Sequence, residues 1–187
     1  MALPGDIVAL DKIVDIHWIK HMKYLRISLA TQFLLAAYFQ VINWFNLGPW
    51  NDQPGFVPLF SSIISGKIEL GDVGVVCLFL LPFLLFSLAY WRSWKWLMWV
   101  GVAGYAGWLC LQIQTWWVPY LFGATDHWKE TYSRAFGHST KILPSFGDHL
   151  APDAMHLTIQ ILLSVIVTSS IVGLLQLRRS NKASHLT

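Results

Sequence analysis

Charged residues are scarce in this chain. Only 12% of its 187 residues are Asp, Glu, Lys or Arg, whereas 55% are hydrophobic. A soluble domain carries roughly 25% charged residues, so too few charges are present here to cover a water-facing surface. The basic residues form short clusters and no long run, which argues against nucleic acid as a partner. The composition therefore predicts a membrane protein whose first partners are membrane lipids.

Cysteine is also rare, and common catalytic motifs are absent. Cys77 and Cys110 both lie in apolar stretches, and no CxxC occurs, which excludes a thioredoxin-like redox motif. The chain contains no GxSxG, no HExxH and no glycine-rich phosphate loop. None of these patterns assigns a reaction, so whether the chain is an enzyme stays open.

Four long apolar segments are present, at about 27–46, 71–90, 96–118 and 156–177. A helix needs about 20 mostly apolar residues to cross the bilayer core, and each segment meets this length. None carries a charged residue in its central part. We therefore predict an all-α integral membrane protein, a four-helix transmembrane bundle that forms one domain over residues 1–187.

The segments between these spans differ in character. Residues 4–25 place apolar side chains near one face and charges around the others, which predicts an N-terminal interfacial amphipathic helix. Outer loops are expected at about 47–70 and 119–155. The second is the large outer loop between helices 3 and 4.

Two helix starts are readable within the large loop. Asp126 to Phe136 can form a short helix, with Thr125 or Asp126 as its N-cap. Further along, Ala151-Pro152-Asp153 resembles the beginning of the fourth spanning helix, with Pro152 in its first turn.

The basic residues also predict an orientation. Nine Lys and Arg residues lie on the side that holds both termini, and four lie on the other side. The positive-inside rule places the richer side in the cytoplasm. Tryptophans gather near both interfaces, with Trp116 and Trp117 expected at the outer one as membrane anchors. We expect a bacterial plasma membrane as the location, with both termini cytoplasmic.

Small residues predict close contacts between helices. Gly101, Gly104 and Gly107 recur every three residues in the third span, and Ser169 and Gly173 are four apart in the fourth. Such residues let helix backbones approach closely in lipid. A bulky residue at Gly104 or Gly107 is therefore expected to destabilise the bundle. The alternative is a dimerisation surface, which leaves a homo-oligomer open.

Hydrogen-bonding side chains gather in the outer half of all four spans. They are Gln40, Asn43, Asp72, Gln112, Gln114, His156 and Gln160. Such groups need partners in lipid. They either bond to one another and hold the bundle together, or they line an outward-facing polar pocket to which Arg134 of the large loop contributes.

Asp153 and His156 are the candidate catalytic pair. They are three residues apart, so they share a face of a helix. With His149 they would suit a metal ion such as Zn²⁺, although the spacing matches no established motif. A hydrogen bond that fixes the start of the fourth span is the simpler interpretation. The sequence indicates no other cofactor.

Three functions remain open. The preferred one is a binding protein whose outward-facing polar pocket takes a lipid-like or small amphipathic ligand, or a partner membrane protein. The alternative is a membrane enzyme that acts on a lipid-soluble substrate with His and Asp chemistry at the outer face. A transporter is disfavoured, because no ionisable residue lies near the centre of any predicted span.

The predicted topology is testable by cysteine labelling in intact cells. Single cysteines within 124–150 should react with an impermeant reagent, whereas cysteines within 1–20 and 180–187 should react only after permeabilisation. Labelling of the termini in intact cells would reverse the orientation.

Overall fold

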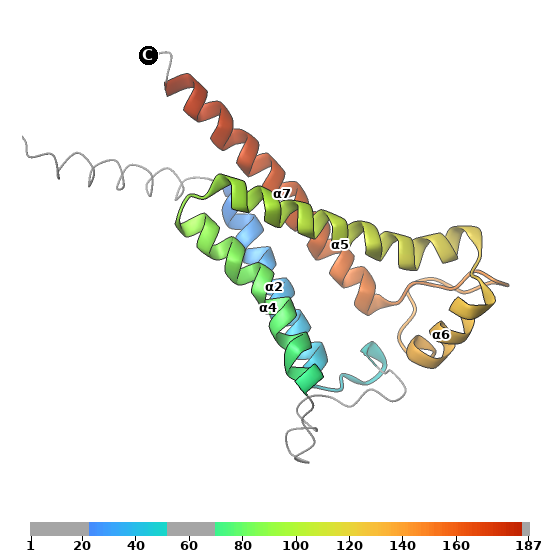
Figure 1. The fold of residues 1–187 in the computed structure, drawn as a ribbon. Coiled ribbons are helices and arrows are strands. Elements are labelled where there is room, and N and C mark those ends of the chain that lie inside the picture. Colours follow the sequence, from blue (N-terminus) through green and yellow to red (C-terminus); the bar gives the residue numbers. More distant parts are fainter. Residues whose placement is uncertain (1–22, 52–69, 185–187) are drawn as a thin grey trace, which may run out of the picture.

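The computed structural model describes residues 23–51 and 70–184, and within these ranges the fold is all-helical (Figure 1). This part of the predicted fold class is confirmed. The predicted amphipathic helix at 4–25 lies almost wholly outside the described residues, as does most of the first predicted loop.

Four long helices form the body of the protein. They are α2 (Lys23–Trp44), α4 (Leu70–Trp91), α5 (Lys95–Phe122) and α7 (Ala154–Ser184). Among the described residues, α2, α5 and the Ala154–Arg179 part of α7 are long and apolar enough to cross a membrane. The side chains described for α4 form a shorter apolar stretch, Leu80–Trp91. The structure therefore contains three candidate spanning helices by length and composition.

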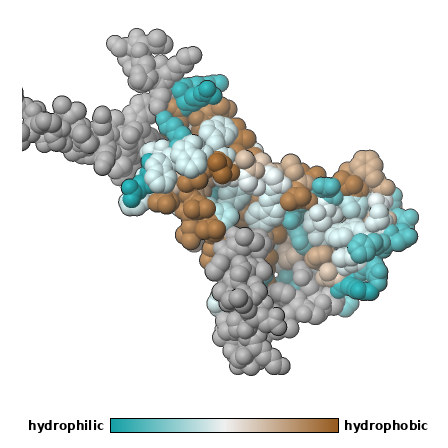
Figure 2. Space-filling view, viewed as in Figure 1, coloured by the Kyte–Doolittle hydropathy of each residue, from teal (hydrophilic) through white to brown (hydrophobic). Residues whose placement is uncertain are grey.

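The two ends of the helices differ in chemistry. One end, here called the basic end, carries Lys23, Arg26, Arg92, Lys95, Arg178 and Arg179. The other, here called the loop end, holds α6 (Asp126–Phe136) and residues 137–153 (Figure 1). Hydrophilic residues gather over α6, while apolar residues cover much of the surface between the ends (Figure 2).

Helix α7 is the central element, because it packs along both α2 and α5. One apolar cluster lies toward the loop end and includes Phe39, Tyr105 and Leu163, one from each of these helices. A second cluster lies toward the basic end, where Leu25, Phe86 and Leu174 join α2, α4 and α7. Helix α4 reaches the body through α2 and α5.

A chain of polar contacts runs between three helices inside the apolar body. Ser28 and Ser170 share a hydrogen bond of 2.5 Å, and the Gln32 amide donates to the Ser28 hydroxyl at 2.9 Å. The Tyr105 hydroxyl then donates to the Gln32 side-chain oxygen at 3.2 Å. All four side chains are buried, and their contacts join α2 to α7 and α5. These bonds satisfy polar groups where no water is available to do so.

Two of the helix boundaries that differ from the sequence prediction lie next to a proline. Helix α5 continues to Phe122 through Pro119, beyond the expected end at 118. A proline so near the C-terminus removes one backbone bond without ending the helix. Helix α7 begins at Ala154, so Pro152 lies before its first turn, and Asp153 takes the capping position.

The predicted close approach of small residues holds at two glycines and is wrong at two others. A Cβ atom at Gly101 would lie 2.7 Å from the Phe86 ring, and one at Gly173 would lie 2.7 Å from Leu25 Cγ. At Gly104 and Gly107 an added Cβ would meet no atom of the described residues within 4 Å. Spacing alone places small residues on a helix and does not say whether a neighbour packs there.

Gly173→Leu should destabilise the protein, because Leu25 closes on that position from α2 through both its side chain and its backbone nitrogen. Overpacking of this kind costs about 1–3 kcal/mol. We expect a lower thermal midpoint in detergent, with Gly107→Leu as the matched control that leaves the midpoint unchanged. Equal midpoints for the two variants would contradict the α2–α7 contact.

Candidate functional site

The loop end is built by the C-terminal part of α5, by α6, and by residues 137–153 that return to α7. Helix α6 has the predicted bounds, and the Thr125 hydroxyl caps it by accepting from the Trp128 backbone at 3.3 Å. The returning segment pairs with itself, since Ile142 N donates to Pro152 O at 3.2 Å. Thr140 N also donates to Pro49 O at 2.7 Å, which ties the segment to the short helix η1 (Gly48–Trp50).

Asp153 is fully buried and forms the centre of this end. Its Oδ1 accepts a hydrogen bond from the His156 backbone at 2.8 Å, so it caps α7. Its two oxygens also lie 2.8 and 2.9 Å from His156 Nδ1, and the Ser139 hydroxyl donates to Oδ2 at 3.4 Å. The predicted hydrogen bond between Asp153 and His156 is present.

Aromatic side chains enclose the imidazole of His156. Its ring centroid lies 3.9 Å from that of Trp116, at an interplanar angle of 30°, and Phe136 meets it edge-on at 5.2 Å. Trp116 is only 3% exposed and also contacts Trp128 and Tyr132 edge-on. The sequence suggested an interfacial anchor at Trp116, and its place over His156 was missed.

Lys141 and Tyr132 both lie near the buried carboxylate of Asp153. The Lys141 ammonium lies 4.4 Å above the Tyr132 ring, and it donates to Ser139 Oγ at 3.0 Å and to the Phe136 carbonyl. Burial lowers the pKa of Lys141, and the charge of Asp153 partly opposes this. The Tyr132 hydroxyl donates to Ala151 O at 2.5 Å, and burial, with Asp153 nearby, raises its pKa to about 12. Near neutral pH the tyrosine is therefore a neutral donor.

His149 lies apart from this pair. Its Nδ1 is 2.7 Å from the Tyr120 carbonyl oxygen, and its ring stacks on Phe146 with centroids 4.5 Å apart. Among the residues that the structure describes, no three His, Cys, Asp or Glu side chains are grouped to hold a metal ion. The proposed ligands His149, Asp153 and His156 are therefore not brought together.

Several residues of the predicted polar pocket are engaged elsewhere. Within α2, Gln40 accepts from Trp44 Nε1 at 3.1 Å, and Asn43 donates to the Phe39 carbonyl at 2.7 Å. Gln114 is exposed, and Arg134 forms a surface ion pair with Glu130. Asp72 lies outside the described side chains.

Gln112 and Gln160 form the most unusual part of the site. Helices α5 and α7 run antiparallel (Figure 1), and the Trp116–His156 contact sets their register. Gln112 lies one turn before Trp116 on α5, and Gln160 lies one turn after His156 on α7, so both glutamines are on the basic-end side of that contact.

Each of these glutamines carries an unsatisfied group. Trp117 Nε1 donates to Gln160 Oε1 at 2.7 Å, which leaves Gln160 Nε2 buried without an acceptor. Gln112 Oε1 is buried without a donor. These are the two buried side-chain polar atoms without a partner in the described part of the chain.

The chain was compared with protein-family models, curated proteins and solved structures, and none matched.

The coupling of Asp153 to His156 is testable by a double-mutant cycle. Asp153→Ala removes a helix cap and a buried hydrogen-bonded carboxylate, which should cost about 2 kcal/mol or more. Asp153→Asn keeps the cap and should cost less. Because the groups touch, Asp153→Ala combined with His156→Ala should cost less than the sum of the single changes. Additive shifts of the thermal midpoint in detergent would contradict this coupling.

Proposed function

We propose that this chain is a multi-pass membrane protein that binds a neutral, lipid-like ligand at its loop end. The ligand would lie between α5 and α7, with a hydroxyl or amide head against Gln112 and Gln160 and beside His156.

The helices and their charges support this membrane arrangement. With 22 residues, α4 is as long as α2, and its sequence is apolar over most of its length. We infer that α4 crosses together with α2, α5 and α7, which completes a four-helix bundle. The basic end lies in the cytoplasm of a bacterial cell, because Lys and Arg are retained on that side of a plasma membrane. The loop end then faces outward.

The unpartnered acceptor of Gln112 and donor of Gln160 carry the proposal. An unsatisfied buried polar group costs about 1–3 kcal/mol, and more in lipid. A hydroxyl or an amide both donates and accepts, so one such group between α5 and α7 can satisfy both glutamines. A neutral head fits better than an anion, because the buried carboxylate of Asp153 lies one turn beyond His156 and would repel negative charge.

The apolar chain of the ligand can pack on exposed apolar side chains of α5. Leu111 and Ile113 flank Gln112 on α5, and both are exposed on the membrane side of the bundle. A ligand head held by the glutamines could therefore keep its chain in lipid. This arrangement suits an amphipathic molecule better than a water-soluble one.

The geometry supports catalysis less well. Asp153 orients the His156 ring as a carboxylate does in an acid–base pair. The hydroxyl nearest to the pair, that of Ser139, bonds to the carboxylate and not to the ring. Within the described residues, the imidazole therefore has no hydroxyl nucleophile bonded to it.

The ligand site can be tested by thermal unfolding of the purified full chain in detergent. The probe is a monoacylglycerol, whose diol head donates and accepts, compared with a fatty-acid methyl ester of equal chain length, which cannot donate. At about 100 times its Kd a ligand adds about 2.7 kcal/mol, which corresponds to a midpoint shift of roughly 5–10 °C in a chain of this size. We expect this shift with the monoacylglycerol and a smaller one with the ester.

Variants on α5 provide the matched control. Gln112→Leu should abolish the difference between the two probes, whereas Gln114→Leu, at an exposed position two residues along the same helix, should preserve it. Equal shifts with both probes in the unmodified protein, or equal behaviour of the two variants, would mean that water satisfies the glutamines and that no head group is recognised there.

A further inference from the structure

A cavity of about 300 Å³ lies between α4 and α5, toward the basic end. Its walls include Pro82, Leu85 and Phe86 of α4 and Leu97, Gly104 and Trp108 of α5. Tyr105 also lines it, but the tyrosine hydroxyl is bonded to Gln32. The cavity therefore offers apolar walls.

Two features of the sequence keep this space open. Pro82 lies within α4, and an added Cβ at Gly104 would meet no atom within 4 Å, so none of the described side chains fills the space beside that glycine. The cavity also opens to the outside of the bundle, because its wall residues Leu81, Leu85 and Val100 are 52%, 44% and 57% exposed. In a membrane these side chains face lipid.

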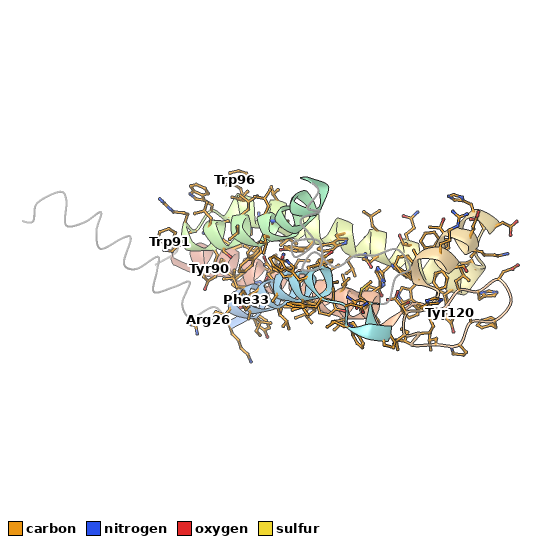
Figure 3. The ribbon with its side chains drawn as sticks, turned by 90° about the horizontal axis from the view of Figure 1, so that it is seen from below. Arg26, Phe33, Tyr90, Trp91, Trp96 and Tyr120 are labelled. Carbon is orange, nitrogen blue, oxygen red and sulfur yellow. The ribbon has the colours of Figure 1, made fainter. Side chains whose placement is uncertain are left out.

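Two basic residues lie a few positions along the chain from the walls of the cavity. Leu97 in its wall follows Lys95 by two residues, and Phe86 precedes Arg92 by six, a rise of about 9 Å along a helix. Arg92 is exposed and its guanidinium lies 5.2 Å from the centre of the Trp91 ring. Figure 3 shows Arg26, Tyr90, Trp91 and Trp96 at this end, far from Tyr120.

The acidic side chains that the structure describes, Asp126, Glu130, Asp148 and Asp153, all belong to the loop end. The basic end of the described chain is thus complementary to an anion, and the cavity beside it is complementary to an apolar chain. An anionic phospholipid has both parts at this depth of a membrane.

We propose that the α4–α5 cavity holds an acyl chain of an anionic phospholipid whose phosphate binds Arg92 and Lys95. Basic residues at the cytoplasmic surface attract anionic head groups, and sites between spanning helices hold such lipids. The volume lies within the range of small-molecule sites, which are mostly apolar with a few placed polar groups. The site shares no residue with the glutamine site at the loop end and does not depend on the function proposed there.

Native mass spectrometry of the delipidated full chain tests this site. The probes are phosphatidylglycerol and phosphatidylcholine with identical acyl chains, so that only the head-group charge differs. We expect phosphatidylglycerol to bind more tightly, by on the order of fivefold for each basic residue that contacts the phosphate. Arg92→Gln should reduce that preference by a similar factor without weakening phosphatidylcholine binding.

Two glycine variants separate the cavity from the surface charge. Gly104→Leu fills the cavity and should weaken binding of phosphatidylglycerol, whereas Gly107→Leu, which also meets open space but does not line the cavity, should bind it normally. If the thermal midpoint of Gly104→Leu shows that this variant does not fold, Val100→Phe replaces it in the test. Val100→Phe narrows the cavity from an exposed position in its wall.

Three outcomes would overturn the proposal. Gly104→Leu or Val100→Phe could bind phosphatidylglycerol as Gly107→Leu does, which would leave the cavity empty of lipid. Arg92→Gln could retain the full preference for phosphatidylglycerol. The protein could be a dimer that Gly104→Leu dissociates, in which case a second copy of the chain, and not a lipid, occupies the cavity.

Discussion

A polar group inside an apolar helix bundle must find a partner, and this constraint organises the protein from one end to the other. Toward the basic end, Ser28, Ser170, Gln32 and Tyr105 bond in sequence and join three helices. Such contacts are worth about 1 kcal/mol or less each in lipid, but their directions specify how the helices meet. Near the loop end, some of the buried polar atoms of α5 and α7 have no hydrogen-bond partner among the described residues. The glutamines left with unsatisfied atoms there mark the site that we propose for a ligand.

Asp153 gives the loop end its order. One carboxylate caps α7, orients the ring of His156 and accepts from Ser139, so the returning segment, the helix start and the imidazole are held together. The charge is kept in a buried position by hydrogen bonds and by the ammonium of Lys141 nearby. The aromatic side chains packed on His156 keep this arrangement apart from solvent. Gln160 of α7 lies about one helix turn from this end.

The two proposed sites differ in what they would recognise. The glutamine site offers a donor and an acceptor without net charge, whereas the cavity between α4 and α5 lies beside cations. Since the helices are apolar between these ends, ligands would reach both sites from the lipid. The protein thus presents a neutral site at one end of its helices and a cationic one at the other.

The sequence by itself determined those features that depend on neighbours along the chain. The apolar helices follow from composition and length, and Thr125 caps α6 through residues within one turn of it. Asp153 and His156 meet because a spacing of three residues brings them together on one helix turn. The start of α7 was misjudged by a few residues, because an aspartate cap competed with a proline in the same short segment.

Only the tertiary structure decided which side chains meet across helices. Of the equally spaced glycines on α5, Gly101 packs against Phe86, while an added Cβ at Gly104 would meet no described atom within 4 Å, and spacing cannot distinguish them. The sequence predicts that Trp116 is an interfacial anchor, whereas in the structure its ring packs against His156 of α7. Gln40 is satisfied within its own helix, whereas Gln112 is not, since the register of α5 against α7 leaves it without a donor. In each case the deciding atom comes from a helix distant in sequence, and local patterns carry no information about that partner.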